Sequence, residues 1–158
     1  MKLKAKEILI NTLAKFLVKD KANIYFTHKY INCVKSYDDG TIPSVILNLT
    51  YTDADETFLD NVRDDHGFKR AYDFSPILWT ILHEIGHIKT DFNKYSEEEK
   101  FATAFIEFAL DNAEDEEEYN KARKLHYCVK SEKLATDWAI NFIKRHSLLS
   151  YTMNCFLK

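Results

Sequence analysis

The first segment of the chain mixes apolar and polar residues with the period of a helix. Over residues 1–21 the apolar side chains gather near one side, and Lys and Asn residues interrupt any continuous apolar run. No small-residue cleavage site follows, as a targeting segment would require, and no run approaches the ~18 apolar residues of a membrane span. The pattern predicts an amphipathic helix whose apolar side is formed by Leu3, Leu9, Leu13, Phe16 and Leu17.

The pattern changes to that of β-strands between residues 22 and 52. Residues 22–37, ANIYFTHKYINCVKSY, and residues 42–52, IPSVILNLTYT, are rich in β-branched and aromatic residues. They flank the turn signal DDGT at 38–41, which predicts a hairpin or a meander. Residues 53–73 are acidic and show no clear period. We expect them to form a loop, with at most one helical turn, beside the functional site.

The second half of the chain carries helix signals. Ser75 and Pro76 suit an N-cap and a first helical position, so a helix is predicted over residues 76–91. Ser96 and Glu99 form a capping box for a second helix that continues to about residue 112. A charged segment, interpreted as a solvated helix or loop, leads to a last helix over residues 131–146. This order predicts one α+β domain over residues 1–158, with a small antiparallel or mixed sheet packed on a helical layer.

Composition limits the classes of function. The 158 residues suit one domain, and a net charge of -3 offers no basic excess for nucleic acid, which we do not expect as a partner. Neither do we expect a membrane. The cysteines, Cys33, Cys128 and Cys155, are far apart and form no Cys-x-x-Cys pair. An odd number of cysteines without a disulfide framework predicts a reducing, cytoplasmic location.

Residues 83–87, HEIGH, place two histidines and a glutamate inside the apolar 76–91 helix. His83 and His87 are four residues apart, so both imidazoles leave one face of the helix and can reach one ion at about 2.0–2.1 Å. Glu84 points off to the side, where a carboxylate can contact a metal-bound water. The pattern His-Glu-x-x-His therefore predicts two metal ligands and one general base.

Two other interpretations of this pattern have to be considered. The histidines could be core residues, each bonded to a backbone carbonyl. Alternatively, the metal could be purely structural, but such zinc sites usually have four protein ligands and favour cysteine, and no cysteine lies near the motif in the sequence. A catalytic zinc needs a third protein ligand and one open position.

The HEIGH motif and the later segment EKLATDWAINFI, residues 132–143, resemble the glutamate-ligand zincins (gluzincins). The nearest resemblance is to the ImmA/IrrE-like peptidases of bacteria, phages and other mobile elements, whose downstream helix carries a glutamate three residues before an alanine and six before an aromatic-Ala pair. Glu132, Ala135 and the pair Trp138-Ala139 occupy these positions. The resemblance covers residues 45–145 loosely and only the two short motifs strongly. It implies a zincin-like fold with Zn²⁺ held by His83, His87 and Glu132.

The chain departs from the family pattern in three ways. The spacing from His87 to Glu132 is long, as if residues 111–125 were inserted. Thr136 stands where the family commonly has an aspartate, and we expect the neighbouring Asp137 to supply that carboxylate. Residues 99–110 also repeat part of the second motif without the aromatic-Ala pair. Glu99, or its neighbour Glu98, is therefore the competing candidate for the third ligand.

Several other residues invite a role. Asp91 shares the face of His83 and His87 but lies about 12 Å along the axis from His83, too far to share the ion. Gly86 costs about 1 kcal/mol inside a helix, which predicts close approach of another element. We expect Trp79 and its neighbours Ile77, Ile81 and Leu82 to be core. Candidates for stabilising an oxyanion, each also interpretable as a surface or capping residue, are His28, His66, His126, His146, Tyr95 and Tyr127.

The expected function is zinc-dependent hydrolysis of a peptide bond in a protein or peptide substrate, with Glu84 as the general base. The family resemblance implies that the substrate is a regulatory protein such as a repressor. We expect a free sheet edge within SVILNLTYT, residues 44–52, to hold an extended substrate. The alternative is a zincin-fold module that binds or regulates a protein partner with little or no turnover. A third interpretation, a non-catalytic helical protein, requires the motif to be accidental.

Overall fold

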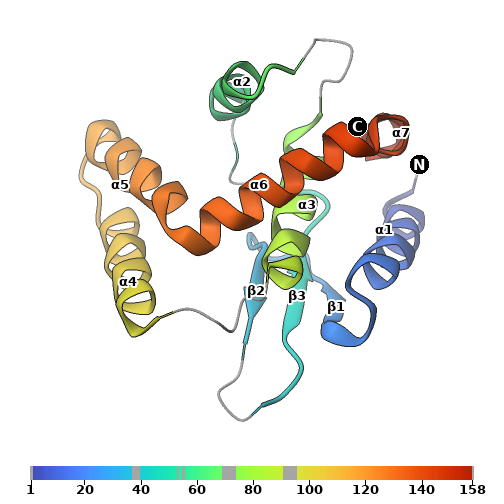
Figure 1. Cartoon of the computed structure of the whole chain (residues 1–158), viewed down its shortest axis with the longest axis horizontal. Helices are drawn as coiled ribbons and strands as arrows, with labels where there is room; N and C mark the ends of the chain where they lie inside the picture. Colours follow the sequence, from blue (N-terminus) through green and yellow to red (C-terminus); the bar gives the residue numbers. More distant parts are fainter. Residues whose placement is uncertain are drawn as a thin grey trace.

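The computed structural model describes residues 2–36, 40–52, 54, 56–68, 74–90 and 96–157 (Figure 1). Within them the chain forms helices and three short strands. Their bounds, in chain order, are α1 Leu3–Val18, the short 3₁₀-helix η1 Lys19–Lys21, β1 Asn23–Phe26, β2 Cys33–Lys35, β3 Ser44–Leu47, α2 Glu56–Asp65, α3 Pro76–Lys89, α4 Glu97–Asp111, α5 Glu116–Cys128, α6 Lys130–Arg145 and α7 Ser147–Leu157. Four residues with expected roles, Asp38, Asp39, Asp91 and Tyr95, lie outside the described residues.

The strands form a mixed sheet in the order β1-β3-β2. β2 and β3 pair antiparallel, with Val34 opposite Val45, which confirms the predicted hairpin pairing around residues 38–41. β1 lies on the other side of β3 and runs parallel to it. The α+β class with a small mixed sheet is therefore confirmed. The expectation that residues 44–52 provide a free edge is wrong for their strand, because β3 is the central strand and β2 is the edge nearest the metal-binding motif.

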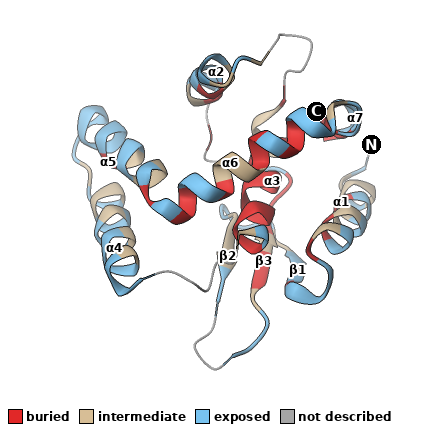
Figure 2. Ribbon diagram, viewed as in Figure 1, coloured by how far each residue is buried: buried red, intermediate tan, exposed pale blue. Residues whose placement is uncertain are grey.

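Helix α3 runs through the centre of the molecule. Ser75 caps it by accepting a hydrogen bond from the Leu78 N–H, and Pro76 takes the first helical position, as predicted. Every residue from Leu78 to Ile88 is buried, which Figure 2 shows as a red helix surrounded by the other elements. A helix buried on all sides needs partners on all sides. For α3 these are α1, α6, α7 and the sheet.

Helix α6 approaches α3 closely at Gly86. A Cβ atom built on Gly86 would lie 2.6 Å from the carbonyl oxygen of Ala135 and 3.0 Å from its Cα. The predicted close approach of another element at this glycine is therefore confirmed. The contact matters for the site because it fixes the distance between the HEIGH helix and the helix that carries Glu132.

Gly86→Ala is expected to destabilise the protein by about 1–3 kcal/mol, the usual cost of overpacking, despite the ~1 kcal/mol advantage of alanine in a helix. The atoms that the new methyl group meets belong to the α6 backbone, so Ala135→Gly should not rescue the variant. Urea denaturation of the single and double variants provides the measurement. A Gly86→Ala protein as stable as the parent would contradict the described contact between α3 and α6.

Two helices were not predicted from the sequence. Residues 56–65, expected to be a loop with at most one helical turn, form the ten-residue helix α2. The tail of the chain, for which no element was predicted, forms α7 and packs against α3 and α6. None of the helices in the described part of the chain is long and apolar enough to cross a membrane.

Candidate metal centre

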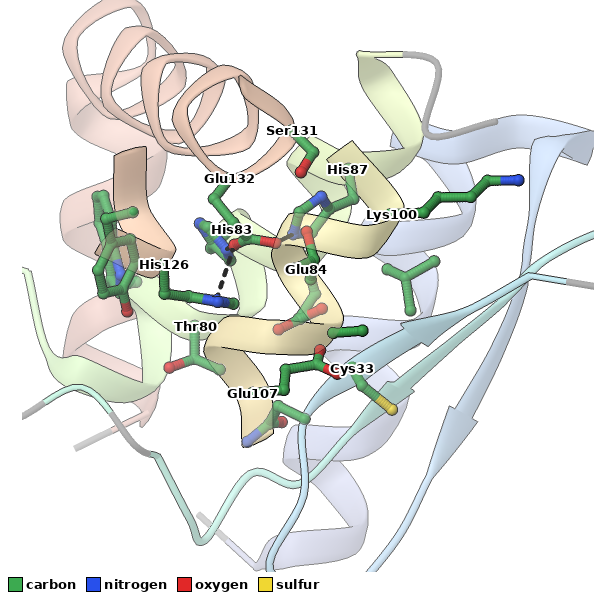
Figure 3. Close-up of a pocket in the computed structure, with 16 residues that line it drawn as sticks. Cys33, Thr80, His83, Glu84, His87, Lys100, Glu107, His126, Ser131 and Glu132 are labelled. Carbon is green, nitrogen blue, oxygen red and sulfur yellow. Dashed lines mark hydrogen bonds and ion pairs between the residues drawn. The ribbon is translucent and has the colours of Figure 1, made fainter. Parts of the chain in front are cut away.

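Helices α3 and α6 bring three potential metal ligands together. His83 and His87 come from α3, and Glu132 comes from the first turn of α6 (Figure 3). One ligand atom from each lies within 4.8 Å of the other two, and all three side chains are buried. The candidate ligands named from the sequence therefore meet at one point, although 45 or more residues separate Glu132 from the histidines.

The distances from the Glu132 carboxylate to the two histidines are close to those between the ligands of a zinc ion. The Nε2 atom of His83 is 2.9 Å from Oε2 of Glu132, and Nε2 of His87 is 3.3 Å from Oε1. Two bonds of about 2.0–2.1 Å at a tetrahedral angle place ligand atoms about 3.3 Å apart. Two imidazole nitrogens and one carboxylate are also a donor set that zinc accepts in catalytic sites. The residues present therefore fit a zinc ion in the type of their donor atoms, and these atoms, which lie within 4.8 Å of one another, would have to move only slightly closer to share it.

The carboxylate of Glu132 is charged in this environment. Burial alone would raise the pKa of Glu132, but hydrogen bonds from three imidazoles outweigh burial and hold the pKa far below its ordinary value of 4.5. The third imidazole belongs to His126, whose Nε2 lies 3.3 Å from Oε2 of Glu132. Without a metal ion, protons on the imidazoles balance the negative charge of this buried carboxylate. A metal ion can displace these protons and bind to the same groups.

Two of the imidazoles that contact Glu132, those of His87 and His126, have raised pKa values. Burial alone would lower the pKa of His87, but its hydrogen bond to Glu132 and the charges of Glu132 and Glu84 raise it above 6.5. His126 behaves alike: burial lowers its pKa, and the hydrogen bond and charge of Glu132 more than compensate, so the pKa is raised.

These directions predict the pH dependence of the metal-free protein. Stability contributed by the raised histidine pKa values is fully present below the ordinary value of 6.5 and is lost as pH rises through the folded-state pKa values. Stability contributed by Glu132 is present above 4.5 and is lost only in strong acid. We therefore expect urea denaturation in the presence of a chelator to show falling stability as pH increases above 6.5.

Zinc should reverse this trend, because its ligands must lose their protons to bind it. The stabilisation produced by saturating zinc is thus expected to increase with pH. Glu132→Gln is the matched control, because it keeps the shape of the side chain and removes the charge that raises both histidine pKa values. Two results would contradict these pKa directions. One is a chelator-treated parent protein whose stability rises with pH above 6.5. The other is a Glu132→Gln variant whose stability falls with pH as much as that of the parent.

The residue that contacts the far nitrogen of His83 is not the expected carboxylate. Thr136 places its Oγ1 3.4 Å from Nδ1 of His83, a long contact. Asp137 instead accepts a hydrogen bond from Lys133 at 2.7 Å on the exposed side of α6. The expectation that Asp137 supports the ligands is therefore wrong: adjacent residues on a helix point about 100° apart, and of these two residues Thr136 is the one directed at His83.

The competing glutamates have other positions. The Glu99 carboxylate accepts a hydrogen bond from the Ser96 N–H and completes the predicted capping box of α4. Glu98 is exposed on the same helix. Neither belongs to the group of potential ligands found among the described residues. Of the other candidate polar residues, His126 and Tyr127 line the cavity described next, whereas His28, His66 and His146 do not.

A cavity of about 430 Å³ opens over the metal cluster. One wall is the edge strand β2, with Cys33 and Val34, and another is helix α4, with Lys100 and Glu107. This volume is typical of a ligand-binding cleft. The complete lining, labelled in part in Figure 3, is Asn32, Cys33, Val34, Trp79, Thr80, His83, Glu84, His87, Lys100, Thr103, Ala104, Glu107, His126, Tyr127, Ser131 and Glu132.

The residues around the motif divide into core and cavity. Ile81 and Leu82 are core, as expected, and Ile77 packs against it. Trp79 belongs to both, since it is buried in the core and also lines the cavity, with its ring stacked 6.1 Å from that of His83. The contribution of β2 was not predicted, because its sequence carries no recognisable motif. Helix α4 was considered only as the source of a competing third ligand, and its role as a wall of the cavity was not predicted.

Glu84 lies beside the candidate metal ligands but is not one of them. It is buried, lines the cavity and is not in the group that could hold the ion. Its negative charge acts on both His87 and the Cys33 thiol, so it lies between the cluster and the edge strand. Burial, followed by the charge of Glu84, raises the pKa of Cys33. That thiol is therefore a neutral wall residue.

One pocket is thus lined by the His83–His87 pair, by the two glutamates Glu84 and Glu132, and by the edge strand β2. The chain matches no protein-family model, no curated protein and no solved structure, so its function has to be inferred from this geometry.

Proposed function

We propose that this protein is a zinc-dependent peptidase that hydrolyses a peptide bond in a protein substrate. The observation that carries the proposal is the buried group of His83, His87 and Glu132 at the floor of a cavity, with the Glu84 carboxylate beside it. A structural zinc site usually has a fourth protein ligand. The group found among the described residues has three, which leaves one position for a water molecule or a substrate oxygen.

When bound, zinc would lower the pKa of a coordinated water to about 7 and polarise the carbonyl to be attacked. Glu84 would accept the proton of the attacking water and pass it to the leaving amine. Its burial supports this role, because a carboxylate with little access to bulk water keeps the proton within the site. The adjacent position of Glu84 on α3 also supports it, since its side chain leaves the helix beside the ligands and not among them.

The edge of β2 would hold the substrate in an extended conformation. Among the described residues β2 pairs only with β3, so its outer edge can accept a further strand. Asn32 anchors the start of this strand: its side chain donates to the Tyr51 carbonyl and accepts from the Asn48 N–H. Backbone hydrogen bonds along such an edge bind a peptide largely independently of its sequence. This arrangement supports a peptide as the substrate class.

His126 and Tyr127 are placed to act on the carbonyl oxygen of the substrate. Both line the cavity, and His126 already reaches the Glu132 carboxylate. A positioned N–H or O–H donor stabilises the negative charge that develops on this oxygen. We assign this role first to His126, whose side chain is more exposed toward the cavity than those of the candidate ligands.

The sequence resemblance to the ImmA/IrrE-like zincins supports the same proposal. It suggests a zincin-like arrangement of the HEIGH helix and the helix that carries the third ligand, and a cytoplasmic regulatory protein as the substrate. The packing of α3 against α6, which brings Glu132 to His83 and His87, supports this part of the proposal.

The proposal predicts about one zinc per chain and a hydrolytic activity that depends on it. Protein purified without chelator should contain about one equivalent by elemental analysis, and it should cleave members of a quenched fluorescent peptide library. Chelation should abolish cleavage and added zinc should restore it. Failure to take up zinc would contradict the metal site. One equivalent of zinc without cleavage of any peptide or protein substrate would favour the alternative, a binding or regulatory module.

A further inference from the structure

Helix α4 has three distinct faces. Lys100, Thr103, Ala104 and Glu107 line the cavity. A second face, with the partly buried Ile106, Ala109 and Leu110, is directed about 120° away and packs against α5. The third face contains Phe101, Phe105 and Phe108, which the helical spacing i, i+4, i+7 places on one side.

This third face, the aromatic face, has no cover in the described structure. Phe101, Phe105 and Phe108 are 77%, 69% and 66% exposed. Helix α4 contains no buried residue, and Figure 2 shows it in pale blue and tan beside the red core. The three residues together expose about 400 Å² of surface, most of it aromatic. An apolar patch of this size on a monomer commonly marks a binding site.

The aromatic face continues the wall of the cavity. Each phenylalanine directly follows a cavity-lining residue in the chain: Lys100, Ala104 or Glu107. Successive residues on a helix differ by about 100°, so the two faces are neighbours around the axis along two turns of α4. A polypeptide that leaves the cavity over this wall would meet the aromatic face next.

The charge of α4 defines the chemistry of what it can bind. The helix carries five acidic residues and one lysine, and that lysine already pairs with Glu97 at 3.1 Å. A segment with lysine or arginine residues beside its apolar side chains complements this charge. A second copy of the chain would present the same acidic helix, and a two-fold contact would oppose like charges. The exposed area is also about half of the ~800 Å² per partner that a stable interface needs.

We propose that the aromatic face of α4 is an exosite that docks an apolar, basic segment of the protein substrate next to the residues held in the cavity. This inference rests on the proposed peptidase function. The small area is then sufficient, because the cavity and the strand edge supply the remaining contacts.

The test uses a displayed library of random 24-residue peptides, selected for binding to the zinc-loaded Glu84→Gln protein. The best binders are then measured by fluorescence anisotropy on three forms of that protein. One is unchanged, one carries Phe101→Ser, Phe105→Ser and Phe108→Ser, and the matched control carries Ile8→Ser, Phe16→Ser and Leu148→Ser. The control residues are 61%, 75% and 79% exposed and do not line the cavity. Denaturation curves verify that all three proteins fold.

The exosite predicts selected peptides rich in apolar and basic residues, at least tenfold weaker binding by the aromatic-face variant, and a change of no more than twofold in the control. Equal binding by the aromatic-face variant and its parent, or a library without binders, would overturn the exosite. So would a dimer in sedimentation that the aromatic-face variant converts to a monomer. Peptides that require the aromatic face but resist cleavage by the unchanged chain would uphold the exosite and refute the peptidase. Peptides that the unchanged chain cleaves, but that the aromatic-face variant binds as tightly as its parent does, would uphold the peptidase and refute the exosite.

Discussion

Replacing Glu84 by Gln is expected to lower the rate of peptide hydrolysis by a factor of at least about 10², because a general base usually contributes about 10²–10⁴-fold. Glutamine has nearly the same shape, so packing within the buried α3 helix should hardly change. It cannot accept a proton from water, so the nucleophile is no longer generated. Zinc content and the free energy of unfolding should remain those of the parent protein. The measurements are kcat on a cleaved library peptide, elemental analysis and urea denaturation.

His83→Ala provides the comparison for Glu84→Gln. It removes a ligand, so zinc content and activity should fall together, whereas Glu84→Gln should separate them. Added zinc in excess should restore part of the activity of His83→Ala and none of that of Glu84→Gln. A Glu84→Gln protein that cleaves its peptide at the parental rate would place the base elsewhere and refute the role given to the HEIGH motif.

The second large effect concerns the third ligand. Glu132→Ala should weaken zinc binding by more than 100-fold, because changes to groups that only support the ligands already cost about 10–100-fold. Glu99→Ala is the matched control: it also removes a glutamate from the first turn of a helix, but one that caps α4. It should leave zinc affinity within about twofold of the parent. Competition with a chromophoric chelator measures both affinities.

A reversed ranking of these two variants would show that α4 and not α6 completes the site. Equal, small effects would show that neither glutamate binds the ion. In either case the close approach of α3 and α6 at Gly86 would be a packing feature without a role in ligation.

The parts of the fold that local chemistry specifies were predictable from the sequence. Ser75 with Pro76 and Ser96 with Glu99 set the starts of α3 and α4, because cap hydrogen bonds involve residues within one turn. The spacing of His83 and His87 was equally local. Their meeting with Glu132 depends on how α6 packs on α3, which only the family resemblance suggested.

The two missed helices show where local patterns fail. The buried stripe of α7 contains Ser150 and Asn154 along with Met153 and Leu157, so half of it counts as polar in a hydrophobicity pattern. The Asn154 side chain is buried because it accepts the backbone N–H of Ser75 at 2.6 Å, at the start of α3. In α2, the numerous acidic residues conceal a core face of only two buried residues, Leu59 and Val62.

The walls of the cavity were not predictable because they depend on contacts between distant segments. The alternation of apolar and polar residues along a strand does not reveal the order of strands in a sheet. Here β2 is an edge strand because β1 pairs with the other side of β3. His126 precedes α6 in the chain and had no spacing relation to the motif. Its approach to Glu132 follows from the packing of α5 against α6.

The most direct test of the central claim is anomalous diffraction at the zinc edge from crystals of the zinc-loaded protein. The account predicts one strong peak about 2.0–2.2 Å from Nε2 of His83, Nε2 of His87 and a carboxylate oxygen of Glu132, with Glu84 outside bonding distance and the cavity side open. A peak elsewhere, a site closed by Glu99, or no peak after soaking in zinc would contradict it.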